Sequence, residues 1–493
     1  MNIQKRIVEK KIEKRAYING RYVDAIDKEI IQKTSSIDGS DLSGIASCKK
    51  EDVDIAVQAA KEAFESGIWS KTTHAHRKEV LLHLAALMEK NRETLALLDT
   101  YETGRAYKNY YEDSIPKAIE ALRYFAESID KYYDVSIPSD TTEFGIIKKV
   151  PLGVVGLITP WNDPMVVSAW KYGPALAMGN SVILKPAEQS SLSAIFLAGL
   201  TKEAGIPDGV FNVVPGYGET AGKALALHKD VRGIFFTGSS EVGKKIMTYA
   251  GESNMKKVGL ECGGKGPYIV TESCKNVKES AKVLSDNMFY NQGQICSAPS
   301  RVIVSENKYD EFMKALKVEC ERYVPGDPFD DENNVGCVVS REQYNKIKKY
   351  IEEGVSSGAD VYQATGEKKH HKDACCIKPT IISDIDATSK LAREEIFGPV
   401  VVVLKAKSTE DAISIANDSN YGLAGAIWTD DLNEAFYVAN RVEVGLLHIN
   451  SYGNDDNRSP FGGVKESGLG KDKSMYAFDE YSDLKSIWVH IKK

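Results

Sequence analysis

The fold is decided by a stretch that holds VVGLITPWNDP (154–164), SVILKPAE (181–188), VFNVV (210–214) and GIFFTGSSEVG (233–243). Each piece contains a short apolar run bounded by Gly, Pro or Asn, which is typical of a buried strand. Segments long enough for helices separate these runs. The stretch therefore predicts strand–helix–strand–helix–strand–helix, the order of a parallel, doubly wound α/β sheet.

Similar patterns extend outward in both directions. Apolar residues at helical spacing predict helices near 50–67 and 77–91. A second α/β unit is expected from Pro267–Val270 through Arg301–Val304 and Val400–Val403 to Gly445–Asn450. No Pro/Gly/Ser linker divides the two units, so we expect them to pack closely. The last residues, 483–493, contain an alternating Ile-Trp-Val-His-Ile strand whose edge favours pairing with another subunit.

Composition excludes several classes of protein. The chain has 493 residues, 42% of them hydrophobic, which is enough for two or three domain cores. Its net charge of −7 and its lack of a basic block argue against a nucleic-acid partner. No apolar run approaches membrane-spanning length, and residues 1–14 are too charged for a secretory signal. Eight cysteines without a C-x-x-C pair favour reduced thiols in the cytoplasm and no structural metal.

Three residues are candidates for catalysis. Cys296 follows a polar, glycine-containing turn, and a thiolate there would attack a carbonyl carbon. Glu261 precedes a double glycine at a strand end and is a candidate base, while the Asn162 amide is a candidate donor to an oxyanion. Taken singly, each has an ordinary alternative: a packing cysteine, a solvated glutamate and a turn asparagine.

Three further segments are candidates for binding a dinucleotide. The turn from Thr237 to Lys244 opens a helix, where backbone N–H groups suit phosphate, although it lacks the G-x-G-x-x-G order. Lys185 and Glu188 close a strand and are placed to contact ribose hydroxyls. The run 394–399 offers carboxylates and an aromatic ring. A capped helix, a surface ion pair and a charged helix end are the respective alternatives.

Taken together, these segments resemble the aldehyde dehydrogenase superfamily, in family order and over almost the whole chain. The resemblance implies that Cys296 is the nucleophile, that Asn162 and the Cys296 backbone N–H form an oxyanion hole, and that Glu261 activates the hydrolytic water. It implies NAD, with NADP disfavoured by Glu188. The implied cofactor contacts are Ile158, Thr159, Trp161, Lys185, Glu188, Gly238, Ser239, Val242, Gly243, Glu395 and Phe397.

The fold implied by the resemblance has three parts. An NAD-binding Rossmann-like domain is expected over 1–128 and 151–263, and an α/β catalytic domain over 264–470. A β-arm for oligomerisation is expected over 129–150 and 471–493, so the chain should form a homodimer or homotetramer. Two positions depart from the family pattern: Cys262 replaces an aliphatic residue, and Asp472 replaces a glutamate proposed to relay protons.

The substrate is predicted less sharply. Segments 251–256 and 471–474 resemble the γ-glutamyl-γ-aminobutyraldehyde dehydrogenase branch. The implied substrate tunnel consists of Asp163, Trp170, Ile295, Ser297, Tyr452, Asp455 and Asp456. Its acidic members suggest a cationic or polar amino aldehyde, unless those aspartates face water or pair with Arg458. A CoA-acylating semialdehyde dehydrogenase and a non-catalytic structural protein on this fold remain the alternatives, although both predict loss of residues that are present here.

Overall fold

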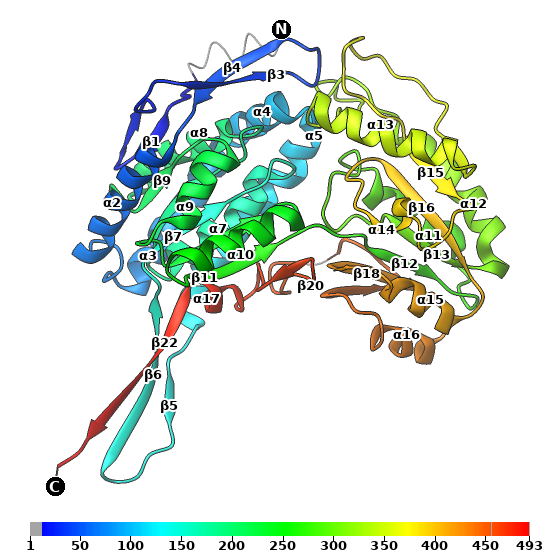
Figure 1. Ribbon diagram of the computed structural model, residues 1–493. Coiled ribbons are helices and arrows are strands. Elements are labelled where there is room, and N and C mark those ends of the chain that lie inside the picture. Colours follow the sequence, from blue (N-terminus) through cyan, green and yellow to red (C-terminus); the bar gives the residue numbers. More distant parts are fainter. Residues whose placement is uncertain (1–11, 455, 493) are drawn as a thin grey trace.

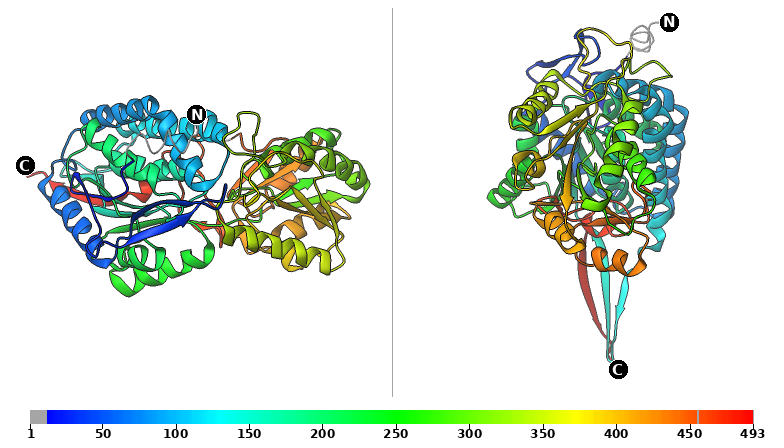
Figure 2. Two further views of the ribbon diagram at one scale, coloured as in Figure 1. Left: turned by 90° about the horizontal axis from the view of Figure 1, so that it is seen from above. Right: turned by 90° about the vertical axis from the view of Figure 1, so that its right-hand side faces the viewer.

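The computed structural model describes residues 12–454 and 456–492 and contains two α/β units joined side by side (Figures 1 and 2). The predicted parallel strands are β7 (Val154–Ile158), β8 (Ser181–Lys185), β9 (Phe211–Val213) and β10 (Gly233–Thr237). Together with β11 (Lys257–Glu261) they lie in the order β9-β8-β7-β10-β11, all parallel. The expected doubly wound α/β fold is confirmed.

Helices cover both faces of this first sheet, as its uniformly buried strands require. They include α2 (Lys50–Ser66) and α3 (His74–Lys90), which confirm the helices expected near 50–67 and 77–91, and α7 (Pro164–Ala177), α8 (Leu192–Ala204) and α10 (Ser240–Ser253). The strand order reverses between β7 and β10, and ligands of such sheets bind where loops diverge at that point.

The second unit has a seven-stranded sheet whose order is β14-β15-β16-β13-β12-β18-β19. Its strands are β12 (Pro267–Val270), β13 (Arg301–Ser305), β14 (Asp360–Gln363), β15 (Thr380–Ser383), β16 (Val400–Ala406), β18 (Ala424–Trp428) and β19 (Leu446–Ile449). Only β14 runs antiparallel to its neighbour. Helix α11 (Val277–Met288) precedes β13, and the loop between them contains Cys296.

Two connections join the units. The chain passes from β11 directly to β12, and it later returns from β19 to add β21 (Gly468–Leu469) antiparallel to β11. The first sheet is therefore completed by residues that lie about two hundred positions beyond its neighbouring strand β11.

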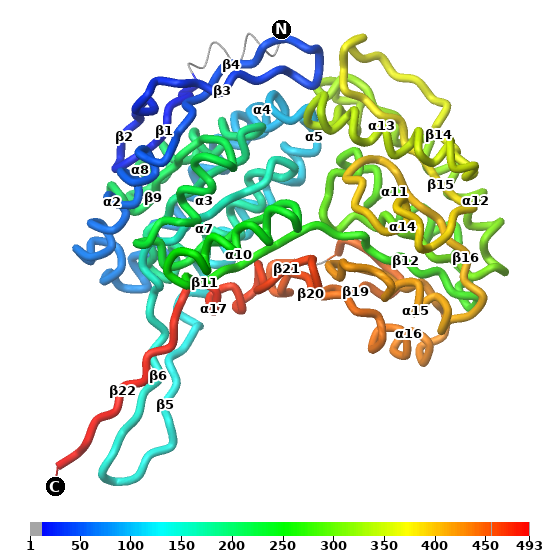
Figure 3. The backbone as a smooth tube through the Cα atoms, in the orientation of Figure 1, coloured from blue at the N-terminus to red at the C-terminus, as the bar shows by residue number. Residues whose placement is uncertain are grey.

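A slender arm projects away from both units (Figures 1 and 3). It consists of β5 (Val135–Ile137), β6 (Glu143–Pro151) and the terminal strand β22 (Ser482–His490), which pairs with β6 along its whole length. Several of its apolar side chains, including Leu484 and Trp488, are exposed. In the described part of the chain, no helix is long and apolar enough to cross a membrane.

Candidate active site

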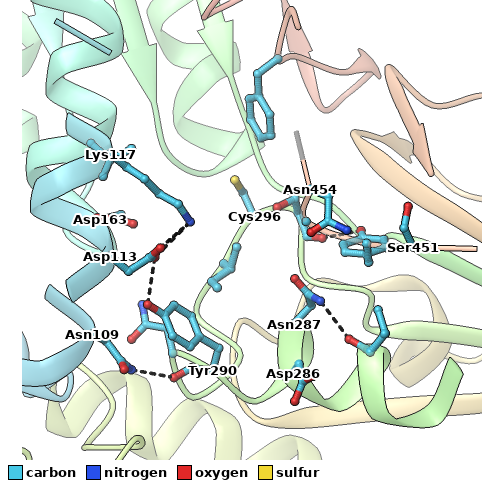
Figure 4. Close-up of a pocket in the computed structure, with 18 of the residues that line it drawn as sticks. Asn109, Asp113, Lys117, Asp163, Asp286, Asn287, Tyr290, Cys296, Ser451 and Asn454 are labelled. Atoms are coloured by element: carbon cyan, nitrogen blue, oxygen red, sulfur yellow. Dashed lines mark hydrogen bonds and ion pairs between the residues drawn. The ribbon is translucent and has the colours of Figure 1, made fainter. Parts of the chain in front are cut away.

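A cavity of about 940 Å³ opens between the two units and reaches the thiol of Cys296. Asn162 and Asp163, from the loop after β7, line one side of it, and Ile295, Cys296 and Ser297 line another. In Figure 4 the sulfur of Cys296 points into the space between Lys117 and Asp113 on one side and Asn454 and Ser451 on the other. Asn162 and Cys296, which are 134 positions apart, therefore meet at one cavity.

The loop that presents Cys296 is fixed by the side chains of its own glutamines. Gln292 exchanges two hydrogen bonds with the backbone of Ile377, at 3.1 and 3.2 Å. The Gln294 carbonyl oxygen Oε1 accepts from the backbone N–H of Val339 at 2.9 Å. Gly293 has φ 65° and lies so close to Gly398 that a Cβ would meet its oxygen at 2.1 Å, so only glycine fits there.

Asn162 is held against the same loop. Its Nδ2 donates to the backbone oxygen of Gln294 at 3.0 Å, and its own backbone oxygen accepts from Asn291 Nδ2 at 3.1 Å. A carboxamide carries two N–H donors. With one donor bound to the loop that contains Cys296, the second N–H has a fixed position relative to Cys296 and is free in geometry to meet a developing oxyanion.

Burial keeps the Cys296 thiol protonated. Desolvation, reinforced by the negative charges of Glu395 and Glu261, raises the pKa of Cys296 to about 12. Gly264 lies directly against this residue, because a Cβ at that position would meet the Cys296 carbonyl oxygen at 2.5 Å. The Cys296 backbone is thus packed closely against Gly264, while its partly exposed thiol faces the cavity with two carboxyl groups nearby.

Glu261 is buried, and among the residues that the structure describes neither of its carboxyl oxygens has a hydrogen-bond partner. Burial and the nearby Asp472 raise the pKa of Glu261 well above its ordinary value. The glycine at 462 makes room for it, since a Cβ there would lie 2.5 Å from Oε1. Asp472 forms a buried ion pair with Lys171 at 2.8 Å. Although its side chain is shorter than that of the glutamate expected at this position, it still reaches a partner beside Glu261.

Glu395 lies on the other side of the Cys296 loop. Its Oε1 accepts from the backbone N–H of Gly264 at 2.9 Å, and burial raises its pKa to about 7. The lysine at 265, which sequence reasoning did not select, is fully buried nearby, and burial together with Arg301 lowers its pKa to about 7. Phe397 has φ 55° and packs edge-on against Trp161, with ring centroids 5.3 Å apart.

The remaining cofactor candidates lie at the carboxyl ends of three neighbouring strands: Ile158 and Thr159 at β7, and the others at β8 and β10. Lys185 Nζ forms an ion pair with Glu188 at 3.2 Å. Ser239 caps α10 by accepting from the backbone N–H of Val242. Thr237 has a buried hydroxyl without a hydrogen-bond partner in this turn. Cys262 packs behind this turn. Its Sγ lies 2.8 Å from the position that a Cβ on Gly243 would take, so Cys262 has a packing role.

Five of the seven expected tunnel residues line the cavity: Asp163, Trp170, Ile295, Ser297 and Tyr452. Asp456 is not among the residues that line the cavity; it pairs with the exposed Arg458, and that contact lowers its pKa to about 2. The proximity of an arginine two residues away accounts for this. Asp455 lies outside the described residues.

The cavity wall also contains charged residues that the sequence did not point to. Arg105 pairs with Asp163 at 3.3 Å, and Lys117 pairs with Asp113 at 2.8 Å. Tyr290 donates to Asp113 at 3.0 Å (Figure 4). The Asp113–Lys117 spacing of four is a helical ion-pair signal, but nothing local indicates that it faces a cavity. The described residues include no cluster of metal-binding side chains.

Comparisons with known proteins agree with this geometry. Residues 22–487 match the aldehyde dehydrogenase family. The chain is 44% identical to the NADP/NAD-dependent aldehyde dehydrogenase PuuC of Escherichia coli, over 98% of this chain and 96% of that one. The AldA indole-3-acetaldehyde dehydrogenase of P. syringae, solved as a variant with NAD+ and IAA, has a TM-score of 0.97 at 42% identity, covering 99% of both chains.

A third similar structure is the γ-glutamyl-γ-aminobutyraldehyde dehydrogenase of Burkholderia cenocepacia, with a TM-score of 0.95 and 41% identity, covering 100% of this chain and 99% of that one. Sequence, fold and site geometry therefore converge, and the chain belongs to the aldehyde dehydrogenase family.

Proposed function

We propose that the protein oxidises aldehydes to carboxylic acids with NAD+, using Cys296 as the nucleophile, Asn162 as an oxyanion donor and Glu261 as the base. The observation that supports this most directly is the meeting of Asn162 and Cys296 at one cavity, with Glu261 close enough to raise the pKa of the thiol. A thiol, a fixed amide donor and a base with a raised pKa match the demands of acyl chemistry.

The residues at the ends of β8 and β10 fit a dinucleotide. The N-terminus of α10, with Ser239 as its cap and the unpartnered Thr237 hydroxyl beside it, suits a pyrophosphate. The carboxylate of Glu188 would accept from a ribose 2′-hydroxyl and would repel a 2′-phosphate, which favours NAD over NADP. Glu395 and Phe397, next to the Cys296 loop, would hold the nicotinamide ribose.

The chain's own residues would act in sequence. Cys296 would release its proton to water in the cavity and its sulfur would attack the aldehyde carbon, while Asn162 and the Cys296 backbone N–H stabilise the oxyanion. When bound, NAD+ supplies the hydride acceptor that turns this adduct into a thioester. Glu261 then takes a proton from water, which attacks the thioester and releases the acid. The raised pKa of Glu261 strengthens it as a base.

An amino aldehyde is the substrate class that we propose. Acidic residues outnumber basic ones on the cavity wall; the acids are Glu112, Asp113, Asp163, Glu279, Asp286 and Asp430, and the bases are Arg105, Lys108, Lys117 and Lys473. Asp163 is adjacent to the oxyanion donor, and its buried Oδ1 has no hydrogen-bond partner. A protonated or polar amine on the aldehyde would satisfy that oxygen, and a cavity with excess negative charge favours cations.

The test is a panel of aldehydes assayed by formation of NADH. We expect the wild type to prefer aminobutyraldehyde and betaine aldehyde over hexanal and benzaldehyde in kcat/KM. The Asp163→Asn variant should reduce that preference about tenfold, since it removes a charge worth at least about 1.4 kcal/mol. Asp456→Asn, which changes an aspartate outside the cavity, is the matched control. A wild type that prefers hexanal or benzaldehyde refutes the substrate class.

The CoA-acylating alternative is tested in the same assay. Glu261 provides a base for hydrolysis, so we expect free acid as the product with or without CoA. Formation of acyl-CoA would contradict the proposed role of Glu261. Loss of NADH production in Cys296→Ala, with the fold retained, is the result expected of a catalyst and not of a structural protein.

We further propose that the arm joins copies of this chain into a dimer or tetramer. The supporting observation is that Leu484, Trp488 and Val489 on β22 are exposed on a strand that extends away from the rest of the molecule (Figure 1). An apolar strand edge of this kind is usually covered in an assembly.

A further inference from the structure

Two thiols that the catalytic site does not use lie in contact. The Sγ atoms of Cys337 and Cys376 are 3.2 Å apart, although the residues are 39 positions apart in the chain. Cys337 is buried and Cys376 is half-buried. Cys262, which lies near the candidate active site, packs against Gly243 instead.

The backbone already holds the two thiols in register. Val338 N–H donates to the carbonyl oxygen of Cys375 at 2.9 Å, and Cys337 N–H donates to the Gly104 oxygen at 2.7 Å. A disulfide has an S–S distance of about 2.05 Å, so bond formation needs a closure of about 1.2 Å, shared between the two segments.

Small molecules have a route to this pair. Cys337 lines a separate surface cavity of about 250 Å³, together with Asp38, Phe329, His370 and His371. Cys376 is partly exposed in its own right. Neither thiol lines the cavity that reaches Cys296, so an oxidant approaches them by a different path from the aldehyde.

The segments that carry the two cysteines are hydrogen-bonded to the loop that contains Cys296. Ile377, next to Cys376, exchanges both hydrogen bonds with the Gln292 side chain, and Val339, two residues after Cys337, donates to Gln294. These three hydrogen bonds help to position the loop that contains Cys296. A covalent link between Cys337 and Cys376 therefore changes the spacing of the two segments on which the loop rests.

We propose that Cys337 and Cys376 form a reversible disulfide on exposure to hydrogen peroxide, and that this bond lowers the activity of the enzyme. The Cys376 thiolate attacks one peroxide oxygen and becomes a sulfenic acid, while the other oxygen leaves as hydroxide and takes up a proton as water. The sulfur of Cys337 then attacks the sulfenic sulfur, loses its proton and expels a second water. The two thiols lose two electrons and peroxide gains them; a dithiol reductant reverses the change.

The bond itself is tested without any assay of activity. The intact protein, in a Cys296→Ala background that removes the nucleophile, is treated with peroxide and digested under non-reducing conditions. We expect a mass loss of two hydrogens and one cross-linked peptide pair that joins residues 337 and 376, both reversed by dithiothreitol. The link should persist in Cys375→Ser and be absent from Cys376→Ser and from Cys337→Ala. If peroxide yields no such peptide, or links 375 to 376 instead, the proposal is wrong.

The effect on activity is tested separately, in enzyme with Cys296 intact. Oxidation should lower kcat/KM at least about tenfold, because displacements near 1 Å at a reacting centre cost up to about a hundredfold, and dithiothreitol should restore it. Cys376→Ser should match the wild type before treatment and lose less activity after it. Equal, reductant-reversible losses in both proteins would overturn the regulatory role. Detection of the cross-linked peptide does not depend on the proposed substrate or mechanism, because it requires no activity.

Discussion

Replacing Gly264 by alanine tests how closely catalysis depends on the placement of Cys296. The backbone of Gly264 has no positive φ, so alanine is allowed there conformationally. Its Cβ, however, would lie 2.5 Å from the Cys296 carbonyl oxygen. Close carbon–oxygen contacts in proteins start near 3.3 Å, so the two backbones must separate by at least about 0.8 Å. Neither partner is a side chain that can rotate away.

The expected cost follows from that displacement. A misplacement of about 1 Å at a reacting centre costs up to about 10²-fold, so we expect kcat/KM to fall between about 10- and 100-fold, or about 1.4–2.7 kcal/mol. Alanine keeps the N–H that Glu395 accepts from, so that contact is not removed. The measurement is steady-state NADH formation, accompanied by thermal unfolding to show that the variant is folded.

The matched control is Gly251→Ala, since a Cβ at that helical position meets nothing within 4 Å. This variant should keep full activity and equal or greater stability, because alanine is the better helix former. A folded Gly264→Ala enzyme whose kcat/KM lies within threefold of the wild type would refute the argument that the loop position limits the reaction.

Three further predictions concern other parts of the molecule. Glu261→Gln should release about one NADH per active site in a rapid burst and then turn over about 10²–10⁴-fold more slowly; a normal steady-state rate without a burst would contradict its role as the base. Because the pKa of Cys296 is raised to about 12, the thiolate fraction grows with pH across the neutral range. Alkylation of Cys296 by iodoacetamide should therefore speed up about tenfold per pH unit between pH 7 and 9. A rate that is flat over this range would show that the pKa of the thiol lies below about 7. Trp488→Asp should shift the protein to a smaller assembly in light scattering, with Ser486→Asp as the control on the same strand, and an unchanged mass would argue against the arm as the interface.

Local sequence pattern was sufficient for the sheets but not for the arm. The strands β7, β8 and β10 consist mainly of apolar residues because both faces of the sheet are covered, and this composition is visible in the sequence alone. The arm gives no such signal, since β6 has no core beneath it and gains its order by pairing with β22 from the far end of the chain. The terminal strand was predicted from its own alternating pattern, but the rest of the arm followed only from the family resemblance.

The substrate cavity shows the same limit for side chains. Asp163 was implied by the family resemblance, yet its partner Arg105 lies 58 positions away and could be found only by folding the chain. Asp456 was implied by the same resemblance, but in the folded chain it pairs with Arg458. Pairing between distant charges depends on which segments meet, and spacing in the sequence does not record that.

The pairing of β6 with β22 has a consequence for biosynthesis. Strand β22 follows β6 by roughly 330 residues, so at about 10 residues per second β6 waits roughly half a minute for its partner to be synthesised. During that time its edge is open to the same strand of another nascent chain on the polysome. Two adjacent lysines, Lys148 and Lys149, interrupt the apolar run on β6, and like charges on an open edge discourage such pairing. The same strand that extends from the finished molecule is therefore protected by charge while the chain is still being translated.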